Sequence, residues 1–358
     1  MQQDDEYIRT QFSALRQQGQ RHRDIAEGLG ISEGALIAAH TSAAHSGSLR
    51  ATPLAPAWRD ILAALPGLGE VMALTRNAAC VHEAVGVYGQ GGADAEDFSV
   101  EGANFTLCIN DKEWAQGFAV RENGSKGMQQ SLQFFDAGGT AVHKVFLQAN
   151  SHEQAYAALL KQFDGVLQPA ARAAFSSPTK QPIVEKPDAQ IDVAGLREGW
   201  MRLRGAQGFE PMLSRFGVTR LQALRLADPQ FAQSVDASCV HAVLDVAARD
   251  ALPLAIRVQN VGAAQTRTGR VHRIAVMGPW LNVLDPGFNL HLREDLIASA
   301  WLVKKPSVNG LCLSLELFDT EGNLIAALAG VRQPGKAEPC DWCALMDTLT
   351  EESLPCAS

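Results

Sequence analysis

The sequence predicts an α+β protein made of two copies of one domain, each with N-terminal helices and a large antiparallel β-sheet. Each half reads as helices followed by short strands between turn residues. A shift of 183 positions also aligns the halves without a gap, and the identical residues include Asn77 and Asn260, Gly86 and Gly269, Phe105 and Phe288, Leu107 and Leu290, Val120 and Val303, Ser131 and Ser314, Phe135 and Phe318, and Gly139 and Gly322. A repeat this long exceeds the periods of solenoids, so each copy is expected to be a whole domain, with a ligand cleft between the halves.

The first half is predicted to begin with helices and to continue as an antiparallel meander. Apolar spacing predicts helices over 7–18, 23–28, 32–44 and 55–65. Ser32 is a suitable N-cap for the third of these, after a stop at Gly30. Runs rich in β-branched and aromatic residues predict strands over 69–77, 79–88, 104–110, 131–136 and 141–149. A helix over 150–163 closes this half.

A linker is predicted over 168–188, because this stretch holds four prolines and shows little periodicity. It separates a first domain over 1–167 from a second domain over 189–358. In the second domain, helices are predicted over 191–203, 219–226 and 237–249, strands between 252 and 331, and a last helix over 341–349.

Composition and charge exclude several classes of protein. With 31 Lys and Arg against 39 Asp and Glu, the formal net charge is -8, whereas a general nucleic-acid binder needs clustered basic residues. No apolar run approaches a membrane span, and the polar start lacks the core of a signal peptide, so we expect a cytoplasmic protein without membrane insertion. The seven cysteines, an odd number in mostly apolar sequence, favour reduced thiols.

Residues 21–39 have the spacing of a helix-turn-helix. The would-be recognition helix over 32–44 contains no Lys or Arg to anchor DNA phosphates. The segment is therefore interpreted as a structural helix pair, and no nucleic-acid partner is expected.

Cys340 and Cys343 form a lone CxxC motif. A zinc site needs a second pair of ligands at matching spacing, and a redox site needs a thioredoxin-like setting. Neither accompanies this pair, so the spacing is interpreted as incidental. The GxSxG, P-loop and dinucleotide fingerprints are also absent from the sequence in their structural context.

A histidine on a predicted strand is a further candidate from residue type alone. Side chains alternate along a strand, so His291 in the strand over 288–293 shares a face with Asn289 and Arg293. Its repeat partner is Cys108. Their ordinary roles are those of a hydrogen-bonded sheet histidine and a small core cysteine, and a ligand role stays open for both.

Five long segments give the chain a specific resemblance. They are ALPGLGEVMALTRN at 64–77, SLQFFDAGGTAVHKVFL at 131–147, RFGVTRLQALRLA at 215–227, MGPWLNVLDPGFNLHLRED at 277–295 and IASAWLVKKP at 297–306. Over about residues 7–345 the chain resembles the bacterial cytoplasmic haem-utilisation proteins of the HemS/ChuS/PhuS type. The resemblance implies a tandem duplication that holds haem in a cleft between its halves. It also implies that haem is passed to a haem oxygenase or other haem acceptor, or is degraded when a reductant is given.

The resemblance also implies roles for single residues. The family's proximal iron ligand is a His shortly after a helical Trp that matches Trp200, and this chain has Gln207 at the ligand position. The family's distal Arg is replaced by Cys108. An aromatic residue that lies against the macrocycle matches Arg257, and a Tyr near the C-terminal strand matches Ala329. Three basic residues match those that meet the haem propionates, namely Arg220, Lys305 and Arg332.

Three hypotheses about function follow. The first is a divergent haem-binding and haem-trafficking protein, in which His291, His272, Cys108 or no residue replaces the family's iron ligand. The second is a reductant-dependent haem-degrading enzyme, although the loss of the His and the Arg argues against it. The third is a descendant that binds a related tetrapyrrole, another anionic planar ligand or a protein partner.

Overall fold

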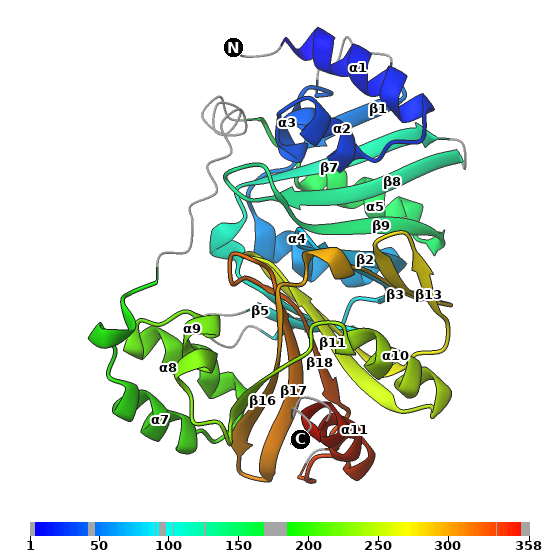
Figure 1. The fold of residues 1–358 in the computed structure, drawn as a ribbon. Helices are drawn as coiled ribbons and strands as arrows, with labels where there is room; N and C mark the ends of the chain where they lie inside the picture. Colours follow the sequence, from blue (N-terminus) through cyan, green and yellow to red (C-terminus); the bar gives the residue numbers. More distant parts are fainter. Residues whose placement is uncertain are drawn as a thin grey trace. The chain divides into compact units, whose positions relative to one another are not determined.

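The chain forms two compact units (Figure 1). The computed structural model describes residues 4–41, 47–89, 91–92, 98–102, 104–124, 127–167, 185–333 and 335–351. Unit 1 comprises Met1–Arg76, Glu83–Gln181 and Asn260–Gln265, and unit 2 comprises Asn77–His82, Pro182–Gln259 and Thr266–Ser358. Each unit thus contains most of one sequence half and a short segment of the other. The predicted linker lies outside the described residues up to position 184.

Unit 1 is built from antiparallel strands and two groups of helices. Its helices are α1 (Asp5–Gln17), α2 (His22–Gly28), α3 (Glu33–Ala38), α4 (Trp58–Ala64), η1 (Leu65–Leu68), η2 (Asp111–Glu113) and α5 (Glu153–Gln162). Neighbouring strands follow the order β1 (Leu49–Pro53), β7 (Gln116–Gly124), β8 (Gly127–Phe135), β9 (Ala141–Ser151) and β2 (Gly69–Arg76). Strands β4 (Gly91–Gly92), β5 (Phe98–Glu101) and β6 (Thr106–Ile109) form a second run.

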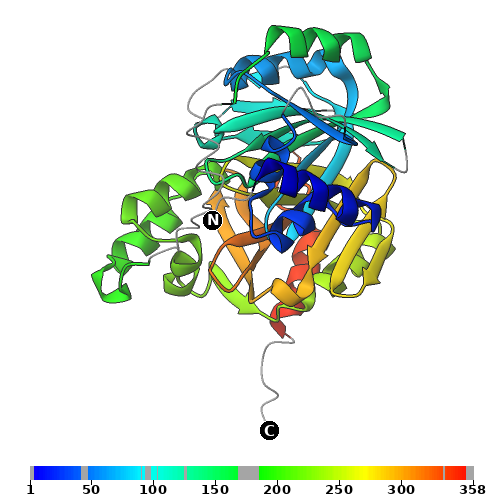
Figure 2. The ribbon, with the colours of Figure 1, turned by 90° about the horizontal axis from the view of Figure 1, so that it is seen from above.

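The two helix groups of unit 1 cover opposite faces of its sheet, as Figure 2 shows for α1 and α5. Phe134 and Phe135 are adjacent on β8, so their side chains point to opposite faces. Phe135 belongs to the apolar core under α1–α3. Phe134 instead packs edge-on against Trp58 of α4, with the ring centroids 6.0 Å apart. The alternation of apolar residues along one strand therefore supports two helical layers.

Unit 2 repeats this plan. Its helices are η3 (Asp188–Gln190), α7 (Val193–Met201), η4 (Ala206–Gly208), α8 (Phe209–Phe216), α9 (Arg220–Leu226), α10 (Cys239–Arg249), η5 (Glu294–Leu296) and α11 (Cys340–Glu351). Neighbouring strands follow the order β10 (Ala232–Val235), β16 (Ser299–Ser307), β17 (Gly310–Phe318), β18 (Leu324–Gly330) and β11 (Pro253–Gln259). A second run holds β13 (Ile274–Met277), β14 (Trp280–Asp285) and β15 (Phe288–Arg293). Two short segments belong to the unit that is formed mainly by the other half of the sequence, and we call them the exchanged segments: Asn77–His82 in unit 2 and Asn260–Gln265 in unit 1. Strand β3 (Cys80–Val87) begins in the first and strand β12 (Ala263–Arg270) begins in the second.

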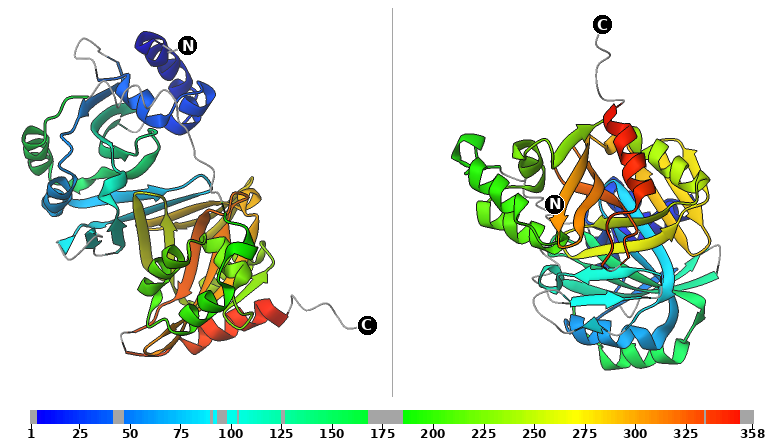
Figure 3. Two further views of the ribbon diagram at one scale, coloured as in Figure 1. Left: turned by 90° about the vertical axis from the view of Figure 1, so that its left-hand side faces the viewer. Right: turned by 90° about the horizontal axis from the view of Figure 1, so that it is seen from below.

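Opposite faces of the unit 2 sheet are again covered by different helices (Figure 3). Phe318 of β17 lies in the apolar core beneath α7–α9. On the other face, Trp342 of α11 donates from its indole nitrogen to the Leu313 carbonyl at 3.0 Å. Helix α11 approaches so closely that a Cβ on Gly330 would lie 2.8 Å from the Trp342 ring, which explains a glycine at this strand position.

The exchanged segments are anchored by the repeated asparagines. In unit 2, the Asn77 amide nitrogen donates to the carbonyls of Gln259 at 3.1 Å and Ile325 at 2.7 Å. In unit 1, Asn260 donates in the same way at 2.9 and 2.8 Å, and its acceptors, the carbonyls of Arg76 and Val142, lie 183 positions before those of Asn77. The amide oxygen of each asparagine accepts the backbone N–H groups two and three residues ahead. The two units therefore form equivalent hydrogen bonds at positions 183 residues apart, as the predicted repeat implies.

The predicted α+β class and tandem repeat are confirmed, and several element boundaries needed correction. Among the described residues, helix α8 and strands β1, β4, β5, β7 and β10 were not predicted. Ser32 caps α3 as predicted, with its hydroxyl accepting from Ala35 N–H, but this helix ends at Ala38. Leu36 and Ile37 of α3 are buried in the core, which favours a structural helix pair over a DNA-reading helix. None of the described helices combines the length and apolar composition needed to cross a membrane.

Candidate functional site

A corner of unit 2 between α7 and β16 gathers several of the predicted site residues. Trp200 at the end of α7 is buried and donates from its indole nitrogen to the Lys304 carbonyl of β16 at 2.9 Å. Its ring also meets Phe209 edge-on, with the centroids 4.7 Å apart. Trp200 therefore fixes the end of α7 and the start of α8 on the strand. The segment from Leu203 to Gly208, which contains Gln207, is held between these two anchors.

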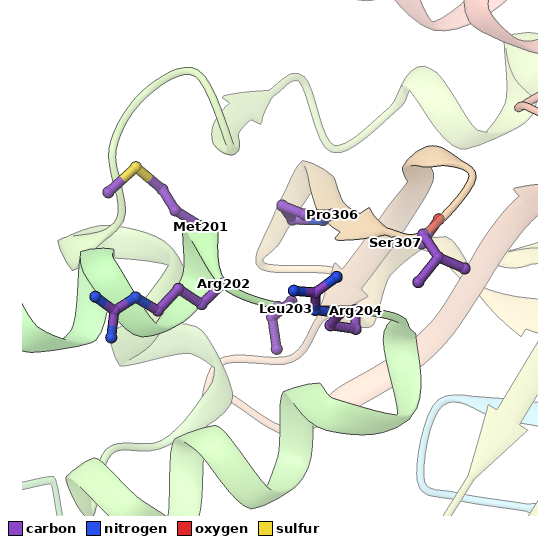
Figure 4. A pocket seen from close by; sticks show the side chains of 7 residues that line it. Met201, Arg202, Leu203, Arg204, Pro306 and Ser307 are labelled. Atoms are coloured by element: carbon purple, nitrogen blue, oxygen red, sulfur yellow. The ribbon is translucent and has the colours of Figure 1, made fainter.

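A pocket of about 640 Å³ opens beside this segment (Figure 4). Its walls come from the C-terminal end of α7 and the β16–β17 turn, and the lining residues are Met201, Arg202, Leu203, Arg204, Pro306, Ser307 and Val308. Met201 and Val308 are 55% and 70% exposed, so the lining offers accessible apolar surface. Exposed apolar side chains next to basic groups are suited to an amphipathic ligand that is apolar in its body and anionic at its edge.

The two arginines of the pocket differ in their surroundings. Arg202 pairs with Glu198 one turn back on α7, at 2.6 Å. The Arg204 guanidinium lies between the Pro306 and Ser307 sides of the pocket (Figure 4) and forms no ion pair with any residue that the structure describes. The predicted propionate residue Arg332 donates to the hydroxyl of Ser307, one of the lining residues, at 3.0 Å.

The other two predicted propionate residues lie together in a buried ion cluster. The Arg220 guanidinium holds both carboxylate oxygens of Glu316, at 2.7 and 2.9 Å. The Lys305 ammonium donates to the same carboxylate at 2.5 Å, and the Ser314 hydroxyl adds a bond at 3.1 Å. Another nitrogen of Arg220 pairs with Glu210. The side chains of Glu316 and Lys305 are only 1% and 7% exposed, so the pairing is internal to the protein.

The Phe209 ring packs against both cations of this cluster. The Lys305 nitrogen lies 4.6 Å and the Arg220 guanidinium carbon 4.9 Å from the ring centroid, which suits cation–π attraction. Burial by itself raises the pKa of Glu316, but the neighbouring Arg220 and Lys305 outweigh it and hold the pKa well below its usual range. Burial lowers the pKa of Lys305, although Glu316 opposes the change. Glu316 is therefore ionised between two cations at neutral pH.

Gln207, which the resemblance matches to the family's iron ligand, is exposed on η4. Its side-chain amide folds back against Gly205, where a Cβ would collide with it. The amide forms no hydrogen bond with the described residues. The role of Gln207 that the resemblance implies stays a prediction.

The remaining candidates lie on other elements. Cys108 is a partly buried residue of β6 in unit 1. In unit 2, Arg257 is exposed on β11 and donates to the Gln259 amide oxygen at 3.1 Å. The His291 imidazole lies 2.7 Å from the Asn282 amide oxygen, as expected for a sheet histidine, and His272 lies 3.4 Å from Asp285. The described residues hold no cluster of three His, Cys, Asp or Glu side chains suited to a metal ion.

Sequence reasoning missed Glu316, Phe209 and Arg204. Glu316 carried a usable signal, because it is the one acidic residue inside the apolar strand LSLELF at 313–318. A charge within a buried strand needs an internal partner, and Arg220 and Lys305 are its partners here. Arg204 carried no such signal, because its exposure depends on where the β16–β17 turn lies.

Comparisons with known proteins agree on the family. The family described as haemin-degrading HemS.ChuX domain matches residues 30–163 and again 217–349. Hemin transport protein HmuS of Yersinia pestis is 34% identical over 327 residues, which is 90% of this chain and 91% of the relative. The structure of holo-PhuS, described as a heme-binding protein from Pseudomonas aeruginosa, is 37% identical with a TM-score of 0.89 and covers 97% of this chain and 99% of that one. ChuS, described as an E. coli heme oxygenase, is 31% identical with a TM-score of 0.83, covering 96% and 99%.

Proposed function

The chain belongs to the haemin-degrading HemS.ChuX family, and on that premise we propose that it binds haem and transports it for haem-iron utilisation. The observation that carries the proposal is the pocket between the end of α7 and the β16–β17 turn. Its volume of about 640 Å³ falls within the range of roughly 300–1,000 Å³ found for small-molecule sites. Leu203, Pro306 and Val308 offer apolar surface to a macrocycle, and Arg204 and Arg332 offer positive charge to its carboxylates.

We further propose that iron ligation in this chain differs from that of the family. A neutral imidazole supplies a firm axial bond to haem iron, and the identity of the axial ligand sets the iron's properties. A glutamine amide is a weak ligand for ferric iron, and Gln207 takes the histidine's place. Haem would then be held mainly by burial of the macrocycle and by contacts with its carboxylates.

Hemin titration of the purified protein tests haem binding directly. We expect the Soret band to shift and the change to saturate at equimolar hemin, because one pocket binds one hemin molecule. A featureless rise without saturation would show nonspecific adsorption and would end the proposal.

Haem degradation is the second candidate, since the related ChuS is described as a heme oxygenase. Degradation needs iron that binds and activates oxygen, for which the replaced His and Arg leave no evident support. Adding ascorbate in air to the hemin complex separates the two functions. We expect the Soret band to persist, and its progressive loss with release of a bile pigment would favour the enzyme.

Gln207→His tests the proposed change in ligation. An imidazole at this position should raise hemin affinity and give the absorption spectrum typical of histidine-ligated haem. Arg249→His, on α10 and outside the pocket lining, is the control and should leave the spectrum unchanged. If Gln207→His also leaves it unchanged, Gln207 does not face the iron.

A further inference from the structure

A chain of hydrogen bonds between side chains lies buried in unit 1. The Tyr88 hydroxyl lies 2.6 Å from Nε2 of His143, and the Thr75 hydroxyl lies 2.9 Å from Nδ1 of the same ring. Thr75 also lies 2.9 Å from the Gln265 amide oxygen, and the amide nitrogen of Gln265 lies 3.0 Å from the Ala73 carbonyl. Each of the four side chains belongs to a residue that is at most 1% exposed, so the chain of bonds is shielded from bulk water.

The Ala73 carbonyl fixes the direction of every bond in this chain. A carbonyl can only accept, so Gln265 donates to it from nitrogen and presents its oxygen to Thr75. The single hydroxyl hydrogen of Thr75 goes to that oxygen, so Nδ1 of His143 carries a hydrogen and donates to Thr75. Nε2 of the neutral ring is then unprotonated and accepts from the Tyr88 hydroxyl. His143 therefore presents a base to a buried phenol.

A base at this position changes what a buried tyrosine can do. Removing one electron from a phenol makes its hydroxyl strongly acidic, and a buried radical cation is costly unless the proton leaves with the electron. The proton acceptor has to lie within hydrogen-bond reach, as Nε2 of His143 does. Burial raises the pKa of Tyr88, so the resting hydroxyl stays protonated. Tyr88 can thus lose an electron and a proton together, but not a proton alone.

Two indole rings give the electron a route out of the buried chain. The Trp114 ring is stacked on His143, with the centroids 6.2 Å apart and the planes 26° from parallel. Trp58 of α4 lies 6.3 Å from Trp114 and is itself 8% exposed. An indole can be oxidised by one electron, so each step of this route joins two groups that can carry the charge.

We propose that Tyr88 is a redox-active tyrosine that gives one electron to an outer-sphere oxidant, such as a ruthenium(III) polypyridyl complex, with His143 as its proton acceptor. The electron reduces ruthenium(III) to ruthenium(II), and the hydroxyl proton moves to Nε2. Tyr88 becomes a neutral phenoxyl radical and His143 an imidazolium. Nε2–H then donates to the phenoxyl oxygen while Nδ1–H still donates to Thr75, so every bond of the chain is kept. This activity goes beyond the proposed haem binding and depends on unit 1 alone.

The protein contains its own control for this test. Of its three tyrosines, Tyr156 is also buried, but its hydroxyl donates to the Ser131 carbonyl at 3.3 Å, and a carbonyl is too weak a base to take the proton. Tyr7 is 48% exposed and can lose its proton to water, so the test uses the Tyr7→Phe chain.

Flash oxidation of the Tyr7→Phe chain with tris(bipyridine)ruthenium and persulfate, followed by freezing, should give a tyrosyl radical in the electron paramagnetic resonance spectrum. Ring-deuterated tyrosine identifies this signal, because it narrows the lines of a tyrosyl radical and not those of a tryptophanyl radical. Tryptophanyl radicals without a tyrosyl radical would refute the proposal.

Substitutions in the same chain assign the radical. Tyr88→Phe should abolish the tyrosyl signal, and Tyr156→Phe should leave it unchanged. His143→Gln keeps an acceptor for the Tyr88 hydroxyl but supplies no base, so most of the signal should be lost in a variant that circular dichroism shows to be folded. A signal that survives Tyr88→Phe, or one that is undiminished in folded His143→Gln, would overturn the inference.

Electron–nuclear double resonance gives a second test that needs no substitution of His143. In the Tyr7→Phe chain it should detect one proton hydrogen-bonded to the phenoxyl oxygen, because Nε2–H keeps the transferred proton there. A phenoxyl oxygen without such a proton would show that His143 does not receive it.

Discussion

The buried imidazole of His82 is a residue whose chemistry follows from its position in the repeat. It lies edge-on against Phe288, with the ring centroids 5.0 Å apart, and hydrogen-bonds to the backbone of Ile256. Its repeat partner Gln265 donates in the same way to the carbonyl of Ala73, which is the repeat partner of Ile256. Equivalent backbone carbonyls in the two copies thus accept from different side chains, and of these two side chains only the histidine titrates.

Burial lowers the pKa of His82 to about 3, and the neighbouring Arg267 adds to this, against an opposing hydrogen bond to Ile256. The unfolded chain protonates this group near pH 6.5, so the associated stability is complete above pH 6.5 and is lost as the pH falls toward 3. His82→Gln copies the other repeat and removes this dependence. Between pH 7.5 and 5, the free energy of unfolding in urea should fall by about 2 kcal/mol less in the variant. Equal falls would show that His82 is protonated in the folded protein.

At the scale of elements, the corresponding helices of the two units carry opposite charges at their first turns. Glu33 is the first residue of α3, after its N-cap Ser32, and pairs with Lys144 of β9. Arg220 is the first residue of α9, after its N-cap Thr219, and pairs with Glu316 of β17. Burial alone would raise the pKa of Glu33, but Lys144 and Arg76 lower it to about 2. Each helix group is thereby electrostatically matched to the sheet of its own unit.

Lys144→Met should show how strongly α3 depends on this pair. The substitution leaves Glu33 buried without its partner, and breaking a buried pair in this way costs about 3–5 kcal/mol. We expect a loss of that order in urea unfolding at pH 7. Adding Glu33→Gln should recover much of it, because the buried carboxylate without a partner is then gone. Lys161→Met on the exposed face of α5 is the control, and a loss as small as the control's would show that water reaches Glu33.

At the scale of the whole molecule, the exchanged segments make each unit dependent on both halves of the sequence. Unit 1 needs residues 260–265 to supply Asn260 and Gln265, and unit 2 needs residues 77–82 to supply Asn77 and His82. Neither sequence half completes a unit by itself. We therefore expect one cooperative unfolding transition for the two units rather than two.

Asn260→Ala tests this dependence. Two carbonyls in unit 1 lose their donor, so the free energy of unfolding should fall by about 1–3 kcal/mol. Fluorescence and circular dichroism should still report one shared midpoint, lowered in both. Asn123→Ala, whose side chain forms no hydrogen bond with the described residues, should leave the midpoint in place. Two separated transitions in Asn260→Ala would show that the units unfold independently.

The sequence by itself determined the tandem α+β plan, because apolar periodicity and the 183-residue repeat record the core of each copy. It also determined the family, since the five matching segments depend on residue order alone. The exchange of segments was decided only by tertiary structure, because the repeat is equally compatible with halves that close on themselves. The same holds for the basic residues. Arg204, Arg220 and Lys305 read alike as surface charges, and only folding pairs two of them with Glu316 and leaves Arg204 open to a ligand. Charge pairing depends on distances in space that residue order does not specify.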